Sequence, residues 1–569
     1  MASIYAVSDF TRLSGGQIEQ LLDHLRDAIS PDIFSKFKKT TRMTELECLR
    51  FTGLTKDQFN SLNKDLLSLY NSPKRTKSQA LATYLFWLKT GLPYRTIATL
   101  FSLNDFQNVG NYCQQVRDSL IKDFVPKNLG PSHISRNEWI KHNTPMVTYL
   151  YNITPSDFAI IADGTYCYCQ KSQDNYFQRK TWNVYKKASL VKPFVLCSTD
   201  GYIVDVYGLY PAVDNDATII KEILKIDVDL KGLLKSGDHI FVDRGFRDAE
   251  NTLERIYGLE IHMPSIVPSR QKQLTTFEAN QTRFVTKCRW TVEAVNGLMK
   301  SLFRANDKIV DNKALPHTLD DFRISAALIN HFHKRLFSDK DNPRLIADQM
   351  KSRLRTSNKL ESILETHGLD RKRKTFKTVE FASIKNFPKL DFNIIKNYIT
   401  LGSYQLKQSL TYLNNLENIE VFEDKKNVLD PNVTLIRTHV QSRHSNAKTY
   451  NTYVAYKPNN NSLDAIDSWF CTCKTGKRTV GCCSHVATLI YKLSLGKNQN
   501  SAKMAKSLAK IFPSTPIIET SESEEENLDI NEAQQSSRLY PDLSSIPGPS
   551  GISSTRLTTT IEIANPYDD

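Results

Sequence analysis

Hydrophobic residues recur at helical spacing in the first part of the chain. The segment "TKSQALATYLFWL" places Leu81, Leu85 and Leu88 on one face of a helix. At its start, Thr76 and Gln79 have the spacing of a capping box. The pattern therefore predicts a capped helix with one buried face.

Two further helices follow in close succession. "PYRTIATLF" predicts a short helix that starts at Pro93, and "NDFQNVGNYCQQVRDSLIKDF" predicts a longer one with Asn104 and Gln107 as a second cap pair. A helix, a short helix, a turn and a longer helix form the helix-turn-helix pattern. We therefore predict an all-α DNA-binding domain at residues 45–135, after a leader at 1–44.

The pattern changes to short apolar runs between residues 155 and 265. "DFAIIADG", "KPFVLCST", "GYIVDVYGL" and "HIFVD" are broken by Gly, Pro and Asp, which is typical of strands. One helix, "NDATIIKEIL", separates the third run from the fourth, and helical spacing returns from about residue 277 to 337. Strands followed by helices predict an α/β domain with a mixed sheet at residues 150–338.

Three segments are predicted beyond this domain. Residues 339–430 are rich in lysine and mostly helical, and are expected to be a basic connector. "VTLIRTHVQS" and "TYNTYVAYK" predict a hairpin that opens a small module at 431–497. Residues 512–569, with "SESEEE" and "SSIPGPSGISS", have the composition of a disordered tail.

Composition adds a nucleic-acid partner to this picture. The 569 residues carry a formal net charge of +14, although the end of the chain from Glu519 is acidic, so the rest is more basic still. A body this basic favours DNA as a polyanionic partner, and the alternative is a basic protein with an acidic tail. No apolar run reaches membrane length, so no membrane partner is expected.

Four of the ten cysteines fall close together in "CTCKTGKRTVGCCSH". Cys471 and Cys473 form C-x-C, and Cys483 and His485 form C-x-H, with Cys482 as a spare thiol that could replace Cys483. Three thiolates and an imidazole fit tetrahedral Zn²⁺, and four protein ligands make such a site structural. The alternative is a set of reduced core cysteines. The hairpin and a following helix would frame the site in a ββα-like module, which is expected to unfold without zinc while the sheet domain stays folded.

Acidic residues sit where strands are predicted to end. Asp163 and Asp243 each close an apolar run, and Glu293 lies in a helix with Asn296 and Lys300 on roughly the same face. Taken singly, such acids are usually turn or surface residues. Carboxylates that converge repel one another unless cations lie between them, and Mg²⁺ suits such a site because it prefers oxygen ligands.

The wider context resembles a known family. "ADGTYCYCQKSQDNYFQRKTW", "VKPFVLCSTDGYIVDVYGLYPAVDNDA", "GDHIFVDRGFRD" and "EANQTRFVTKCRWTVEAVNGLMK" together resemble DDE-type transposases, with the strongest likeness to the Harbinger-type group and the eukaryotic relatives of bacterial insertion-sequence enzymes. The resemblance covers roughly residues 45–337. It implies an RNase H-like fold and a site of two Mg²⁺ or Mn²⁺ ions, with Asp163, Asp243 and Glu293 as the three catalytic acids.

The resemblance also implies a function. The expected activity is metal-dependent DNA strand cleavage and strand transfer at transposon ends. The expected partners are the terminal inverted repeats and target DNA, and a homo-oligomer on DNA is one option for assembly. The cysteine module resembles the SWIM-type zinc finger. The alternative is a domesticated, transposon-derived DNA-binding regulator without catalytic activity; a SWIM-containing ubiquitin-ligase component is the weakest reading.

Several side chains are candidates for contact with DNA. Asn and Gln can pair with adenine in the major groove, and such residues on the predicted recognition helix are Asn104, Gln107, Asn108, Asn111, Gln114 and Gln115. The cations that could hold the DNA backbone are Arg244, Arg283, Lys287, Arg289 and Lys300. A polar surface helix and a solvated charged face are the respective alternatives. "RKRK" at Arg371–Lys374 is a weak nuclear localisation signal, with a solvated helix end as the alternative, and a nuclear location is expected.

Overall fold

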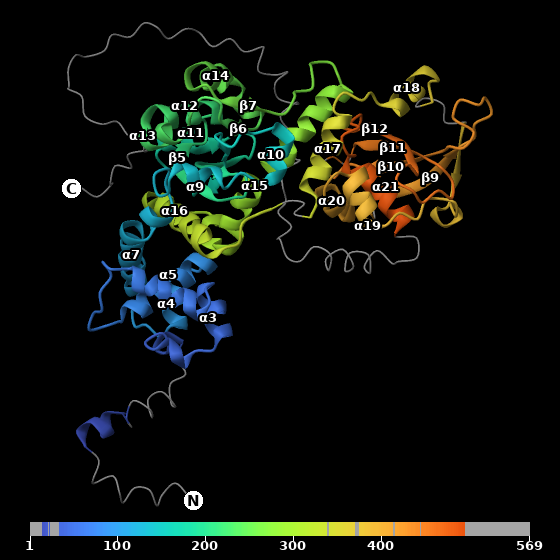
Figure 1. Ribbon diagram of the computed structural model, residues 1–569. Coiled ribbons are helices and arrows are strands. Elements are labelled where there is room, and N and C mark those ends of the chain that lie inside the picture. The colour runs from blue at the N-terminus through green and yellow to red at the C-terminus, as the bar shows by residue number, and fades with distance from the viewer. Residues whose placement is uncertain are drawn as a thin grey trace, which may run out of the picture. The chain divides into compact units, whose positions relative to one another are not determined.

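The computed structural model describes residues 14–20, 22, 33–337, 341–369, 375–413, 416–443, 445 and 447–495 (Figure 1). It divides into two compact units. The first unit contains residues 1–133, 167–172 and 298–333, and the second contains 134–166, 173–297 and 334–569, as far as they are described. The basic tetrad at 371–374, the predicted tail at 512–569 and most of the leader lie outside the described residues.

The first unit is helical. Its main helices are α2 (Ile33–Lys36), α3 (Glu45–Thr52), α4 (Lys56–Asp65), α5 (Lys77–Thr90), α6 (Tyr94–Leu100), α7 (Phe106–Asp123), α8 (Val125–Asn128) and α16 (Leu315–Phe332), and it also contains the short strand β2 (Cys167–Tyr168). The three predicted helices correspond to α5, α6 and α7, and the capping box of Thr76 and Gln79 is confirmed. The second predicted cap is wrong: the N-cap of α7 is Asp105, not Asn104, and its carboxylate accepts from Gln107 N.

A buried ion pair joins α7 to α16 within the first unit. Arg117 Nε lies 2.8 Å from Asp321 Oδ1, and Tyr84 Oη of α5 donates to the same oxygen at 2.7 Å. The side chains of Arg117 and Asp321 are 3% and 7% exposed. Removing one partner would leave a buried charge without compensation, which costs several kcal/mol. Helix α16, predicted as part of the sheet domain, is therefore tied to the amino-terminal helices.

The second unit contains the mixed sheet. Strands β4 (Ala188–Ser198) and β5 (Ile203–Pro211) are antiparallel neighbours, and β4 also pairs antiparallel with β1 (Ala159–Gly164). Strand β1 then runs parallel to β6 (His239–Phe241), and β6 runs parallel to β7 (Glu260–His262). The short strand β3 (Trp182–Asn183) pairs with the start of β4. This mixed α/β arrangement fits the expected RNase H-like domain.

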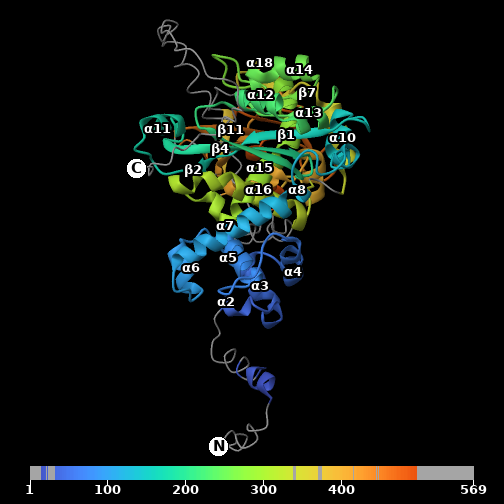
Figure 2. The ribbon, with the colours of Figure 1, turned by 90° about the vertical axis from the view of Figure 1, so that its left-hand side faces the viewer.

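Helices cover both faces of this sheet (Figure 2). On one face, Ile160 and Ala162 of β1 pack in a core with Ile219 and Ile220 of α12 (Asp216–Ile226). On the other face runs α15 (Thr276–Leu302), the longest helix described. The remaining helices of this part are α9 (Arg136–Ile140), α10 (Pro145–Tyr151), α11 (Asn175–Thr181), α13 (Val228–Leu233) and α14 (Glu250–Tyr257).

The carboxyl-terminal part of the second unit has a sheet of its own. Its five strands follow the order β12 (Ile466–Cys471), β11 (Thr449–Tyr456), β10 (Thr434–Gln441), β9 (Leu416–Phe422) and β8 (Phe376–Val379), all antiparallel. Its helical elements are α17 (Pro343–Arg353), α18 (Lys359–Thr366), α19 (Phe392–Ile394), the π-helical turn η8 (Ile395–Ile399), α20 (Tyr404–Tyr412) and α21 (Ser484–Ser494).

The predicted hairpin is confirmed as β10 and β11, but the module is larger than a ββα unit. Strands β8 and β9 lie in the stretch predicted as a helical connector, and helical segments separate them along the chain. Strand β8 has only four residues, and the apolar residues of β9 do not alternate strictly with polar ones, so a local hydrophobic pattern does not reveal them. Among the described residues, every helix is too short or too polar to cross a bilayer.

Candidate active site and metal-ligand clusters

Two predicted aspartates meet at the end of neighbouring strands. Parallel pairing sets Ile161 of β1 beside Phe241 of β6. Asp163 and Asp243 each follow two residues later, so they leave the same edge of the sheet. Asp243 is also the N-cap of the turn η3 (Arg244–Ala249), where its Oδ1 accepts from Gly245 N at 2.8 Å. A Cβ at position 245 would lie 2.9 Å from that oxygen, so glycine gives the carboxylate room.

The third carboxylate of the cluster is Asp216, which the sequence analysis missed. One oxygen from each of Asp163, Asp216 and Asp243 lies within 4.8 Å of the others. Asp216 is the first residue of α12, where an acid is favoured by the helix dipole, so its position had an ordinary explanation. A Cβ at position 164 would lie 2.9 Å from Asp216 Oδ1, so the glycine after Asp163 allows this approach.

Helix α15 brings three more polar side chains to the site from the other face. Arg289 Nη2 lies 3.0 Å from Asp163 Oδ1 and 3.8 Å from Asp243 Oδ2, and its Nη1 lies 2.7 Å from Glu293 Oε1. Asn296 Nδ2 donates to Asp163 Oδ2 at 3.0 Å. Glu293 and Asn296 therefore face the site as predicted, but Glu293 pairs with Arg289 and is outside the three-aspartate cluster. Its role as a metal ligand stays a prediction.

Burial and charge repulsion act together on these carboxylates. Burial raises the pKa of Asp163 well above its ordinary value; the Arg289 charge opposes this, and the charges of Asp243, Asp216 and Glu293 add to it. Burial lowers the pKa of Arg289, but the carboxylates of Asp163, Glu293 and Asp243 outweigh burial and raise it. Arg289 is therefore a permanent cation here.

The donor set fits a divalent cation. Four carboxylates face two cations, Arg289 and Lys192, whose Nζ lies 3.4 Å from Asp216 Oδ1. With all six groups ionised the site has a formal charge of −2, which one Mg²⁺ neutralises. All the converging oxygens are hard ligands of the kind Mg²⁺ and Mn²⁺ take, and carboxylates this close need a cation between them.

Two of the predicted DNA-binding cations are buried and hydrogen-bonded within the protein. Arg283 and Lys287 are 3% and 5% exposed. Arg283 Nη2 donates to Gln405 Oε1 at 3.0 Å, and Lys287 Nζ donates to Leu401 O at 2.9 Å. The prediction that they contact DNA phosphate is therefore wrong for this structure. The sequence pattern of cations along a helix is the same whether the cations face DNA or a protein carbonyl.

The other predicted cations have different surroundings. Arg289 is bound by acids, as described above. Arg244, next to Asp243, is partly exposed, and its Nε and Nη1 are buried without a hydrogen-bond partner among the described residues. Lys300 lies in the last turn of α15, which belongs to the first unit. There its charge opposes the burial that raises the pKa of Cys167 to about 12.

The polar residues of the predicted recognition helix divide into two groups. Asn104, Gln107 and Asn111 are exposed, and Asn108 is half-buried. Gln114 and Gln115 make contacts within the first unit: Gln114 Nε2 donates to Asp118 at 2.7 Å, and Gln115 accepts from Arg75. Asn108 and Asn111 line a shallow hollow that also includes Lys74 and Lys122.

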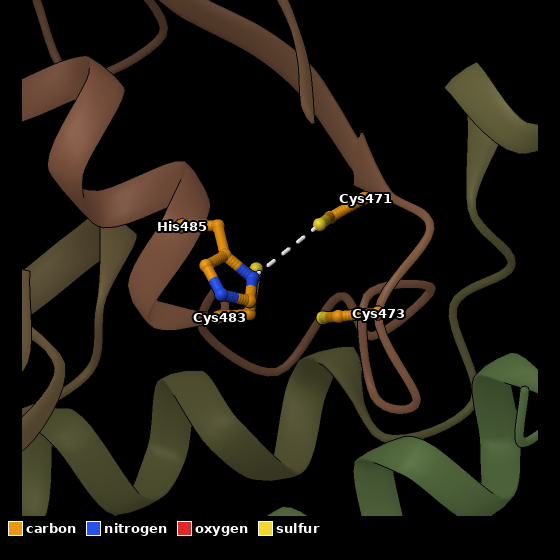
Figure 3. A group of neighbouring side chains, drawn as sticks. All are labelled: Cys471, Cys473, Cys483 and His485. Carbon is orange, nitrogen blue, oxygen red and sulfur yellow. Dashed lines mark hydrogen bonds between the residues drawn. The ribbon is translucent and has the colours of Figure 1, made fainter. Parts of the chain in front are cut away.

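The four predicted zinc ligands converge in the second unit (Figure 3). Cys471 ends β12, Cys473 follows in a turn, Cys483 is the N-cap of α21, and His485 lies in its first turn. All four ligand atoms lie within 4.8 Å of one another, and Cys471 Sγ is 3.6 Å from His485 Nδ1. Three sulfur atoms and one imidazole nitrogen are the donor set of a structural zinc.

The backbone around this cluster is tightly folded. Gly476 N donates to Cys473 O at 2.9 Å, and Gly476 O accepts from Cys471 N at 3.1 Å. A Cβ at position 476 would overlap the Cys471 carbonyl, so only glycine fits. Cys482 is buried outside the group, so the structure brings Cys483, and not Cys482, to the other three residues.

Comparison with known proteins agrees with the site. Residues 162–330 match the family model described as DDE superfamily endonuclease. This stretch contains Asp163, Asp216, Asp243 and Glu293, and it supports a DDE-type transposase family for the sheet domain. Searches of curated proteins and of solved structures returned no significant match.

The three-aspartate cluster predicts a test by metal binding. Asp163→Asn, Asp216→Asn and Asp243→Asn should each weaken Mn²⁺ binding at least about tenfold, because each removes one anionic ligand. The affinity is measured by titrating the full chain with Mn²⁺ and monitoring free Mn²⁺ by electron paramagnetic resonance. Asp214→Asn is the matched control, because Lys192 donates to the backbone carbonyl of this residue, which the substitution keeps, and the Asp214 side chain is outside the three-aspartate cluster. Unchanged affinity in Asp216→Asn would mean that Asp216 only starts its helix.

The sulfur cluster predicts one bound zinc per chain. Cys483→Ala should lose the metal, because three ligands do not close a tetrahedral site. Cys482→Ala should keep it, because this neighbouring thiol is outside the group. Elemental analysis of protein purified without chelator decides between them, and a protein free of zinc would refute the site.

Proposed function

We propose that this protein is a DNA transposase that cleaves phosphodiester bonds and transfers strands at transposon ends. The observation that carries the proposal is the convergence of Asp163, Asp216 and Asp243 within 4.8 Å, in the stretch that matches the endonuclease family model. When bound, two divalent ions supply an activated oxygen nucleophile and stabilise charge on the leaving oxygen.

The chain's own residues prearrange this site. Arg289 and Asn296 each hold one oxygen of Asp163, so its carboxylate is fixed in orientation. The aspartates have the donor chemistry for the first ion. Glu293, whose side chain is 22% exposed, faces the site from α15 and completes the set of acids that the family resemblance implies. With all six groups ionised, one Mg²⁺ would balance the formal charge of −2, so a second ion would need oxygens from a DNA phosphate as well.

Arg244 is proposed as a contact for the scissile strand. It follows Asp243 directly, and two of its guanidinium nitrogens are buried without a hydrogen-bond partner among the described residues. A buried donor without a partner is costly, and a phosphate oxygen would satisfy it with a charge-assisted bond. Arg283 and Lys287 have no such role in the proposal.

We assign the recognition of terminal inverted repeats to α7 in a helix-turn-helix domain, and the sulfur cluster to one structural Zn²⁺ in a SWIM-type finger. Assembly as a homo-oligomer on DNA and a nuclear location complete the proposal. The basic composition of the chain supports a DNA partner.

Catalysis should depend on the acids and DNA binding should not. Asp243→Asn and Glu293→Gln keep size and hydrogen-bonding capacity but remove charge, so each should lower cleavage of the flanking inverted repeats by several orders of magnitude. Mn²⁺ should replace Mg²⁺, and Ca²⁺ should allow binding without cleavage. Gel-shift and cleavage assays on the same DNA separate the two steps.

Glu278→Gln is the matched control on the same helix. Glu278 caps the start of α15 through Thr275, and a glutamine oxygen can still accept those bonds. Wild-type cleavage in Glu293→Gln would remove Glu293 from the site. Specific binding by the wild-type chain without cleavage in Mg²⁺ or Mn²⁺ would instead favour the DNA-binding regulator.

Base reading by α7 predicts a loss of specificity. Asn111→Ala should weaken binding to the transposon end about tenfold or more and leave binding to random DNA nearly unchanged, because Asn111 is exposed beside Lys74 and Lys122. Gln114→Ala is the control, since this side chain bonds to Asp118 and Arg117 within the protein. An equal loss on both DNAs with Asn111→Ala would contradict base reading.

A further inference from the structure

The first half of α15 is bonded to the loop that connects the two pairs of predicted zinc ligands. Asn280 is fully buried, and its Oδ1 accepts from Thr479 N at 2.8 Å and from Val480 N at 2.9 Å. Its Nδ2 donates to Thr479 Oγ1 at 2.9 Å and to Leu354 O at 3.0 Å. Thr479 and Val480 lie in the loop between Cys473 and Cys483, which we call the zinc loop. One side chain of α15 is therefore hydrogen-bonded to the backbone of this loop.

A second amide bonds to the ligand residues themselves. Gln273, just before α15, donates from Nε2 to the carbonyl oxygens of Cys471 at 2.8 Å and Cys473 at 2.6 Å. Leu274 N donates to Lys474 O at 3.1 Å. These carbonyls are in place only while the turn around the thiolates is closed.

Two buried cations continue the contact along the helix. Arg283 and Lys287 bond to Gln405 and to the carbonyl of Leu401, next to Thr400. A Cβ at Gly481 of the zinc loop would lie 2.6 Å from the Thr400 carbonyl, so the loop packs directly against this turn. Five positions in α15 and just before it are therefore bonded to the carboxyl-terminal part of the second unit: Gln273, Leu274, Asn280, Arg283 and Lys287.

The same helix carries the polar side chains of the candidate active site. Arg289, Glu293 and Asn296 follow Lys287 within three turns of one continuous helix. An α-helix advances about 1.5 Å per residue, and its hydrogen-bonded backbone transmits a shift or rotation of one half to the other. The position of Arg289 against Asp163 therefore depends on where the module holds the first half.

We infer that the zinc module is a positioning element for the catalytic helix, with Asn280 and Gln273 as its positioning residues. Zinc keeps the loop folded, the loop holds α15, and α15 sets the position of Arg289 and Glu293 at the carboxylate cluster. This inference rests on the proposed function for its effect on cleavage. It adds to the expectation that the sheet domain stays folded without zinc: the strands keep their fold, and α15 loosens.

Hydrogen–deuterium exchange on the full chain tests the coupling without measuring activity. Zinc removal by chelator should raise exchange of residues 288–297 about tenfold or more and leave β1 and β6 protected. Asn280→Ala should raise the same exchange with zinc bound, and chelation should add little to it. Gln273→Ala, at a less buried site, is the second variant if Asn280→Ala does not fold.

Asn358→Ala is the matched control. This buried asparagine is the N-cap of α18 and donates to Trp469 O and to Lys477 O of the same loop. Its helix bonds to α15 at Thr276, the first residue of α15, where Thr276 Oγ1 donates to Glu361 Oε2 at 3.0 Å, which is far along the helix from residues 288–297. Asn358→Ala should change exchange of residues 288–297 less than about twofold. Equal changes in Asn280→Ala and Asn358→Ala, or no change on zinc removal, would overturn the inference.

Cleavage kinetics separate this inference from the proposed function. Asn280→Ala should lower kcat with little change in KM, and Asn280→Asp, which keeps the acceptor for Thr479 and Val480, should recover part of the loss. A wild-type chain that shows the exchange coupling but never cleaves DNA would refute the proposed function alone. Full cleavage by Asn280→Ala with a loosened α15 would refute the inference alone.

Discussion

Repulsion among carboxylates at one edge of the mixed sheet is the constraint on which the second unit depends. Asp163 and Asp243 leave adjacent parallel strands, Asp216 comes from the start of α12, and Glu293 comes from α15. Arg289 is the counter-ion that makes this possible, because one guanidinium contacts three of the four acids. It is partly buried and cannot lose its proton, so it holds the acids together at any ordinary pH. A divalent ion entering the cluster joins an arrangement that is already compensated in part.

This arrangement places a strict demand on α15. A planar guanidinium bonds to two acids only when both distance and orientation are correct, so small rotations of the helix break the contacts. Three cations of α15 fix its position. Arg283 and Lys287 bond to the carboxyl-terminal part of the second unit, and Arg289 bonds to the acids. Buried ion pairs and hydrogen bonds contribute little net stability, but they select one geometry over its neighbours. For a candidate metal site made of converging acids, that selection of one geometry is the useful property.

Much of the candidate site could be predicted, because its acids and its sulfur ligands stand in local sequence patterns that are typical of such sites. Asp163 and Asp243 were found from apolar strands that end in an acid, and the sulfur cluster was found from ligand spacing. Asp216 was missed because an acid in the first turn of a helix is ordinary, and only the fold shows that it faces the strand ends. The burial of Arg283 and Lys287 was missed because the charge pattern of a helix does not say which polar groups it meets. Strands β8 and β9 and the attachment of α16 depend on contacts between residues far apart in the chain.

Asn280 shows why such long-range contacts escape sequence reasoning. A lone asparagine in a polar helical segment has no signal, yet here its amide bonds to a loop about 200 residues later in the chain. The amide offers two donors and two acceptor sites, and a buried position requires that they be satisfied. The zinc loop supplies backbone groups only in its closed form, because an open loop would present them to water instead. The loop of the candidate zinc site and the helix of the candidate active site are therefore linked by the ordinary cost of leaving a buried amide without partners.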